Sequence, residues 1–259
     1  MACLFLIVCG WVMLRQIPGL SLRPDASWPE AVLLVAALLV TVSTLARQVS
    51  LQSALMAAGV IGLVGASAHW ASYVTGVPFG PLQFPQAYGA TPLQECFSVP
   101  AVIWVVLLLN ARGLARLILE GASKHPNHGY HVLGLSVPLV VAMAMSMEPF
   151  ASTAHRYWLW GEIRLPVTWQ GVPLSCLFAW GAVSVIASIA AMPFLIDKHP
   201  RPLPPAREPA WIWALLSGLF AVGTAVHGLW PATLMAGVSG ALAVGVAFRV
   251  WRKRTKSPA

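Results

Sequence analysis

The residues best able to do chemistry in this sequence are its acids, because only eight Asp and Glu residues occur among 259. Glu95, Glu148 and Glu162 each lie in or beside a long segment rich in aromatic residues, Pro and Gly. Carboxyl groups among aromatic rings could serve as a general acid and a base. The remaining five flank apolar segments or sit in loops, where carboxylates are ordinary: Asp25, Glu30, Glu120, Asp197 and Glu208.

Glu148 ends a fully apolar run, SVPLVVAMAMSMEP, and Pro149 is expected to end the helix that this run forms. A carboxylate so deep in apolar surroundings is costly to ionise, which favours the neutral, proton-donating form. A general acid needs that form. The alternative is a glutamate that reaches the membrane interface without any chemical role, and the residues leave both interpretations open.

Aromatic side chains accompany the acids. An interfacial aromatic belt would have this composition. So would a groove for a long, flat polyene, or a site where ring faces stabilise a carbocation. The residues concerned are Phe79, Phe84 and Tyr88 in one long segment, Tyr157, Trp158 and Trp160 in the other, and Trp104 and Trp180 in the adjoining apolar segments.

The composition predicts that membrane helices position these residues. Hydrophobic residues make up 58% of the chain and charged residues 9%, whereas soluble domains carry about 25% charged residues. We expect an all-α polytopic bundle of eight helices, or seven, since segment 1–14 is short and the last two segments meet at Trp230–Pro231. The apolar segments are 1–14, 29–46, 51–74, 97–119, 131–148, 172–196, 210–228 and 232–251.

The basic residues predict the orientation of this bundle. With both termini in the cytoplasm, twelve of the sixteen Lys and Arg residues fall on the cytoplasmic face, as the positive-inside rule requires. The long segments Thr75–Phe97 and Pro149–Gly171 then share the opposite face, where they could be re-entrant or line a cavity. We expect one integral membrane domain, 1–259, with a Pro-rich cytoplasmic linker at 197–209. The basic tail, 249–259, suits anionic lipids better than nucleic acid.

Several chemistries lack residues to support them. No Lys falls inside an apolar segment, and no nucleotide-binding, CxxC or HExxH motif occurs. We therefore expect neither a cofactor nor a metal ion. Cys96 and Cys176 lie toward the same face and could pair in an oxidising compartment, although a free buried thiol is the commoner state.

Two stretches resemble a known family. They are TGVPFGPLQFPQAYG…FSVPAVIW (Thr75–Trp104) and MEPFASTAHRYWLW…WQGVPLSCLFAW (Met147–Trp180). Their order, spacing and Gly/Pro/Trp skeleton are similar to those of integral membrane carotenoid biosynthesis proteins of the bacterioruberin-pathway and carotenoid 1′,2′-hydratase type. The resemblance spans 75–180. It implies an enzyme that adds water to the terminal double bond of an acyclic carotenoid, without a redox cofactor. The helical spans themselves predict a bacterial inner membrane as its location.

The resemblance also implies roles for individual residues. Glu148 occupies the place of the family's Asp-Pro aspartate and would be the proton donor, and Glu95 would be a second acid or the base that orients water. The aromatic residues of both segments would bind the polyene: Phe79, Phe84, Tyr88, Tyr157, Trp158, Trp160 and Trp180.

Other family positions have lost their polar side chains. Ala144 stands in place of an aspartate, Cys176 in place of an asparagine, and Leu82–Gln86 in place of a polar run. A divergent hydratase fits this pattern. A membrane subunit that binds carotenoid or lipid within a larger pigment complex, without catalysis, fits it as well. A transporter is less well supported, because no apolar segment carries a charge near its middle.

Overall fold

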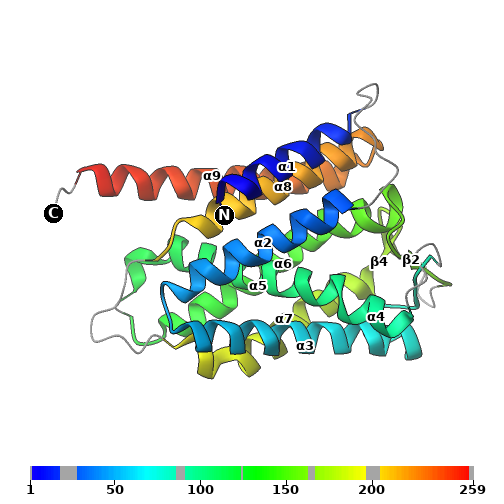
Figure 1. Ribbon diagram of the computed structural model, residues 1–259, viewed down its shortest axis with the longest axis horizontal. Helices are drawn as coiled ribbons and strands as arrows, with labels where there is room; N and C mark the ends of the chain where they lie inside the picture. Colours follow the sequence, from blue (N-terminus) through cyan, green and yellow to red (C-terminus); the bar gives the residue numbers. More distant parts are fainter. Residues whose placement is uncertain are drawn as a thin grey trace.

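Long apolar stretches form helices in a membrane because every backbone N–H and C=O must then be satisfied within the segment. The computed structural model describes residues 2–17, 28–85, 91–123, 125–162, 167–196 and 205–256. Within these ranges the main helices lie alongside one another in one elongated bundle (Figure 1). They are α1 (Ala2–Arg15), α2 (Trp28–Ala46), α3 (Leu51–Thr75), α4 (Pro92–Phe97), α5 (Val99–Ile118), α6 (His128–Glu148), α7 (Leu174–Leu195), α8 (Glu208–Val226) and α9 (Trp230–Lys256).

Seven stretches of helix in the described residues are long and apolar enough to cross a membrane. Helix α1 is not one of the seven. Its 14 residues span only ~21 Å at 1.5 Å per residue, less than the ~30 Å hydrocarbon core. The fold class is confirmed, and the count is the lower of the two expected. Of the two reasons given for a count of seven, the shortness of the first segment is the one that holds, because α8 and α9 remain separate helices around Trp230.

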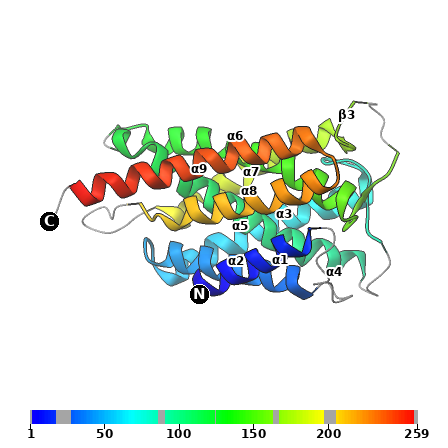
Figure 2. The same ribbon diagram turned by 90° about the horizontal axis from the view of Figure 1, so that it is seen from above.

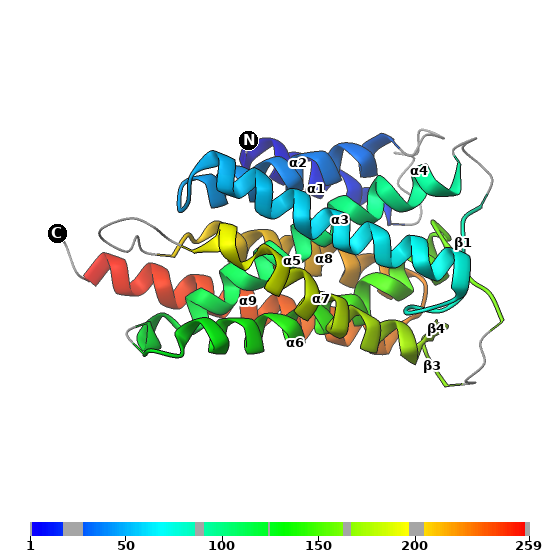
Figure 3. The same cartoon turned by 90° about the horizontal axis from the view of Figure 1, so that it is seen from below.

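The two long segments singled out in the sequence meet at one end of the bundle. Strand β1 (Leu82–Gln83) pairs antiparallel with β2 (Leu159–Trp160), and Leu82 lies opposite Trp160. A second small pair joins β3 (Thr168–Trp169) to β4 (Val172–Pro173). These strands and α4 lie at the end opposite the C-terminus in the views of Figures 1 and 3.

The end of α6 brings Glu148 to this same region. Pro149 does end the regular α-helix, as expected, but the chain continues through one wider, π-type turn from Pro149 to Ala154 (η3) instead of leaving the bundle. A short 3-10 turn, Glu120–Ala122 (η2), follows α5 at the opposite end. The π turn keeps the chain packed against α8 before it rises into β2.

Helix α5 occupies the middle of the bundle and packs against α2, α3, α6 and α8. It reaches α3 closely because Gly65 of α3 has no side chain, and a Cβ there would overlap the Trp104 ring. Helix α1 lies across α2 and α8 (Figure 2), which themselves make few direct contacts. Helix α9 runs alongside α8 and stays helical to Lys256, so much of the basic stretch predicted as a tail continues this helix. Residues 197–204 of the predicted linker lie outside the described part.

Candidate functional site

Glu148 lies at the C-terminal end of α6 and is completely buried. Both of its carboxyl oxygens accept a hydrogen bond from an indole. Trp158 Nε1 donates to Oε2 at 3.1 Å, and Trp180 Nε1 donates to Oε1 at 2.7 Å. The Cys176 thiol also lies within hydrogen-bonding contact of this carboxyl. This acid is therefore buried between two tryptophans and does not reach the membrane interface.

No cation balances this carboxyl among the described residues, where the ion pairs found are Arg15–Glu30 and Arg47–Glu208. An indole N–H can only donate, so both Trp158 and Trp180 require Glu148 to accept. If Glu148 carries a proton, its O–H has no strong acceptor on either indole. The two indoles thus suit a carboxylate, while burial without a cation is costly for one.

A cluster of rings surrounds Trp180. Trp104 stacks on it with centroids 4.1 Å apart and planes at 19°, and Phe79 lies 5.9 Å away. His69 is buried against the same rings, with Nδ1 3.0 Å from the Gly65 carbonyl oxygen and 3.3 Å from Trp104 Nε1. A neutral Nδ1 either donates or accepts, so these two contacts exclude each other, and the shorter favours donation to the carbonyl.

A large cavity of about 560 Å³ lies next to this cluster. Its size is within the range of small-molecule sites. The walls come from α1, α2, α4, α5, α6, η3 and α8 and from the loops beside β1 and β2. Most of the lining is apolar, including Val12, Leu33, Ala37, Ile103, Leu107, Met147, Phe150, Leu216, Leu219 and Phe220.

Four of the residues predicted from the sequence line this cavity: Phe84, Glu95, Tyr157 and Trp158. Phe79 and Trp180 belong instead to the ring cluster around Glu148. Glu148 itself is not among the lining residues. Trp158 forms part of the wall on this side, since it lines the cavity and donates to Glu148, and Met147 and Phe150 line the cavity beside it.

The remaining predicted residues are not among those that line the cavity. Trp160 packs beside the small cluster of Leu82, Ala151 and Trp158, and its buried Nε1 has no partner among the described residues. Tyr88 lies outside the described residues. Cys96 and Cys176 are both free and buried, so the considered disulfide is absent. The exposed Glu162 is not among the residues lining the cavity.

The sequence analysis did not predict one acid of the cavity, nor the cavity-lining residues of α2 and α8. Glu30 was grouped with ordinary flanking residues, yet it lines the cavity and pairs with Arg15 at 3.2 Å. The wall provided by α8 lies outside the 75–180 region of resemblance. Glu30 could have been found only by its position at the start of the apolar segment 29–46, which the predicted topology places on the same side of the membrane as Glu95.

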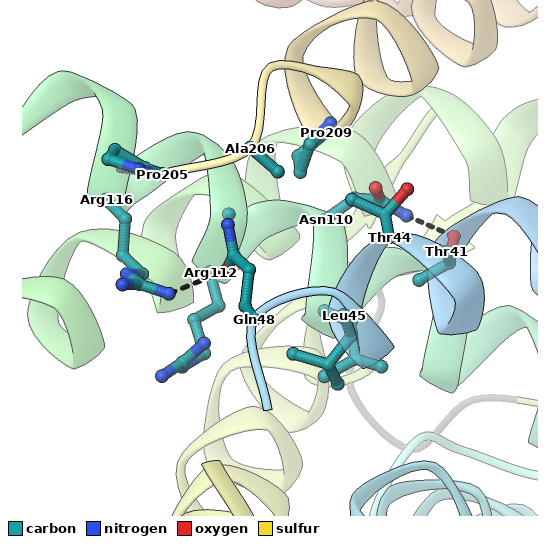
Figure 4. Close-up of a pocket in the computed structure, with 12 residues that line it drawn as sticks. Thr41, Thr44, Leu45, Gln48, Asn110, Arg112, Arg116, Pro205, Ala206 and Pro209 are labelled. Carbon is teal, nitrogen blue, oxygen red and sulfur yellow. Dashed lines mark hydrogen bonds between the residues drawn. The ribbon is translucent and has the colours of Figure 1, made fainter. Parts of the chain in front are cut away.

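A second, much smaller pocket of about 20 Å³ lies toward the other end of α2 and α5 (Figure 4). Asn110 donates to Thr41 Oγ1 at 2.7 Å, and Arg116 donates to Gln48 Oε1 at 2.7 Å. The volume suits a water molecule or two. We interpret these polar contacts as ties between helix ends.

Comparison with known proteins gives one positive result. A family model described as "Carotenoid biosynthesis protein" matches residues 29–248. No curated protein and no solved structure matches the chain. The matched region begins at α2 and ends within α9, so it includes Glu148, the ring cluster and every wall of the cavity except Val12. Because the match covers most of the chain, this multi-pass membrane protein belongs to the carotenoid biosynthesis protein family.

Proposed function

We propose that the protein adds water to the terminal double bond of an acyclic carotenoid, with the carotenoid end lying in the large cavity. The observation that carries the proposal is the position of Trp158, which lines an apolar cavity of about 560 Å³ on one side and hydrogen-bonds a buried carboxyl on the other. The family supports a carotenoid-related protein, and hydration is the specific activity that we propose.

The proposed reaction begins with proton transfer from Glu148 to the CH carbon of the terminal (CH3)2C=CH unit. This leaves a tertiary cation on the dimethyl carbon. The faces of Trp158 and Tyr157, which both line the cavity, can stabilise that positive charge. Water then bonds to the cation and gives one proton to Glu95, so that one water is added and no electrons are exchanged.

Proton transfer from Glu148 requires the Trp158 side chain to move, because this indole stands between the carboxyl and the cavity. Glu95 faces the cavity directly and needs no such movement. A rotation of Trp158 would release one acceptor oxygen of Glu148 and open the wall at the same time. The proposal therefore makes Trp158 both a ring that binds the polyene and the wall that screens the acid.

The test is pigment analysis of a lycopene-producing bacterial host that expresses the chain. We expect a carotenoid heavier by one water, absent when Glu148→Gln or Glu95→Gln replaces the native protein at equal membrane abundance. The matched control is Glu162→Gln, which removes a carboxyl from the same end of the bundle but not from the cavity and should leave the product unchanged. Unchanged lycopene with the native chain would contradict hydration.

A second candidate function is a membrane subunit that binds carotenoid without transforming it, within a larger complex. It is favoured by the donors that already occupy both oxygens of Glu148, since these suit a structural carboxylate. Purified protein that retains unchanged pigment, with Glu148→Gln binding the same pigment, would support this function over hydration.

We further propose that the protein resides in a bacterial inner membrane with both termini in the cytoplasm, and that membrane lipids surround it. The distribution of Lys and Arg supports this orientation. A reporter enzyme active only in the cytoplasm, fused after the last residue, should be active. Activity of a periplasm-specific reporter at that position would reverse the orientation.

A further inference from the structure

The large cavity is polar at one end only. Glu30, Gln94, Glu95 and Ser98 all line it, and they come from the starts of α2, α4 and α5. The other lining residues deeper along these helices, such as Ala37 and Leu107, are apolar. A ligand that fills this space must therefore have an apolar body and a polar tip.

Glu30 is held in place by an ion pair. Arg15 Nη1 lies 3.2 Å from both of its carboxyl oxygens, and the two side chains are only 12% and 22% exposed. Because one nitrogen is shared between both oxygens, each oxygen keeps lone pairs that can accept from another group. Arg15 thus neutralises Glu30 and orients it while leaving it able to accept from a ligand.

Gln94 supplies a donor at the same end. Its Oε1 accepts from the backbone N–H of Thr91 at 2.9 Å and from the Thr91 hydroxyl at 3.1 Å. This capping arrangement fixes the side chain at the start of α4. No hydrogen bond from its amide nitrogen is found in the described part of the chain, so the NH2 group is available to a ligand.

These groups exclude several ligands. A hydrocarbon tip pressed against Glu30 and Glu95 would remove water from two carboxylates without replacing its hydrogen bonds, which is strongly unfavourable. A carboxylate or diphosphate tip would be repelled by Glu95, and Arg15 is already paired with Glu30. A hydroxyl can donate to Glu30 and accept from Gln94, and it carries no charge.

We infer that the polar end of this cavity is a subsite for a hydroxyl group at the end of an acyclic isoprenoid chain, with Glu30, positioned by Arg15, as the acceptor and Gln94 as the donor. This inference rests on the proposed function and deepens it. In the substrate complex the subsite holds water against a hydrocarbon end, and in the product complex it holds the new tertiary hydroxyl. The hydrated end therefore binds more tightly than the hydrocarbon end.

Part of this subsite comes from outside the region that defines the family. The family match begins at residue 29, whereas Arg15 and the cavity-lining Val12 lie on α1. Helix α1 packs across α2 and α8, and its last residue reaches Glu30 at the start of α2. Recognition of the hydroxyl thus depends in part on a helix that lies outside the matched residues.

The experiment compares two pigments with the protein in lipid nanodiscs. The probes are lycopene and the tertiary alcohol that one added water makes at one lycopene end, and binding is followed by quenching of tryptophan fluorescence. A hydroxyl bonded to a charged group should bind about tenfold more tightly. The double variant Arg15→Gln with Glu30→Gln should lose this preference and keep its affinity for lycopene within about twofold.

The matched control removes the other ion pair found in the described residues. Arg47 and Glu208, 2.7 Å apart, lie at the opposite end of α2, so Arg47→Gln with Glu208→Gln should keep the preference. If the first double variant does not fold, Gln94→Leu decides the matter. It removes the donor amide, together with the oxygen that accepts from Thr91, and should lose part of the preference.

Equal affinity of the native protein for both pigments would overturn the inference, as would a preference that survives in the subsite variants. Displacement of the alcohol by a long-chain primary amine at lower concentration would also overturn it, because the polar end would then bind a cation. The binding assay does not depend on turnover. A preference without any hydrated product in cells would refute the proposed hydration and leave the subsite intact.

Discussion

Trp158 contacts both the buried acid and the large cavity, since its Nε1 donates to Glu148 Oε2 at 3.1 Å while its side chain lines the cavity. The buried acid is therefore coupled to whatever occupies the cavity through one indole. Movement of that indole would change both the shape of the wall and the hydrogen bonding of the acid.

The first prediction separates two roles for Glu148. If Glu148 is the proton donor, Trp158→Phe should leave hydration measurable, because phenylalanine keeps an aromatic wall and frees one carboxyl oxygen. If Glu148 only holds Trp158 in position, Trp158→Phe and Glu148→Gln should reduce product formation equally. The measurement is the ratio of hydrated to unchanged carotenoid in the lycopene-producing host, at matched membrane abundance.

The second prediction concerns the stability of the buried carboxyl. Glutamine at position 148 would point an NH2 group at one of two indoles that can only donate, so Glu148→Gln should lower the free energy of unfolding by about 1–3 kcal/mol. Adding Trp180→Phe or Trp158→Phe removes one opposing donor, and the better-matched double variant should recover part of this loss. Thermal unfolding in detergent can be followed with a thiol-reactive dye, because Cys9, Cys96 and Cys176 are buried and free.

The third prediction concerns the close approach of α3 and α5. A Cβ at Gly65 would overlap the Trp104 ring, whereas one at Gly59 of the same helix would meet no atom within 4 Å. Gly65→Ala should therefore destabilise the protein by about 1–3 kcal/mol through overpacking. Gly59→Ala should be neutral or slightly stabilising, since alanine is the better helix former. Equal unfolding temperatures for both variants would contradict this packing.

The fourth prediction concerns the cavity as the pigment site. Ala37 lines the cavity and is 1% exposed, so Ala37→Phe should fill space and reduce the pigment retained on the purified protein at least about tenfold. Val35 lies on the same helix but is 53% exposed, and Val35→Phe should retain pigment normally. Normal retention by Ala37→Phe would locate the pigment elsewhere.

The sequence by itself determined the membrane class and the approximate extent of the long helices, although α4 was not predicted and α9 continues past its predicted end. A span needs about twenty apolar residues in a row, and that requirement is local, so segments such as 51–74 and 172–196 could be recognised without knowing their neighbours. Glu148 could also be recognised locally, because a lone acid at the end of a long apolar run is unusual. The length of α1 could also be recognised from the sequence, because its 14 residues fall short of the roughly twenty that a membrane span needs.

Only the tertiary structure decided which of these residues share a site. Lipid and protein interior are equally apolar, so these helices carry little pattern to indicate which face meets another helix and which meets the bilayer. Nothing local could pair Arg15 with Glu30 beside a cavity or bring Leu216 to its wall. Packing also placed Trp158 between Glu148 and that cavity, because η3 carries the chain back along α8 before β2 turns the indole inward.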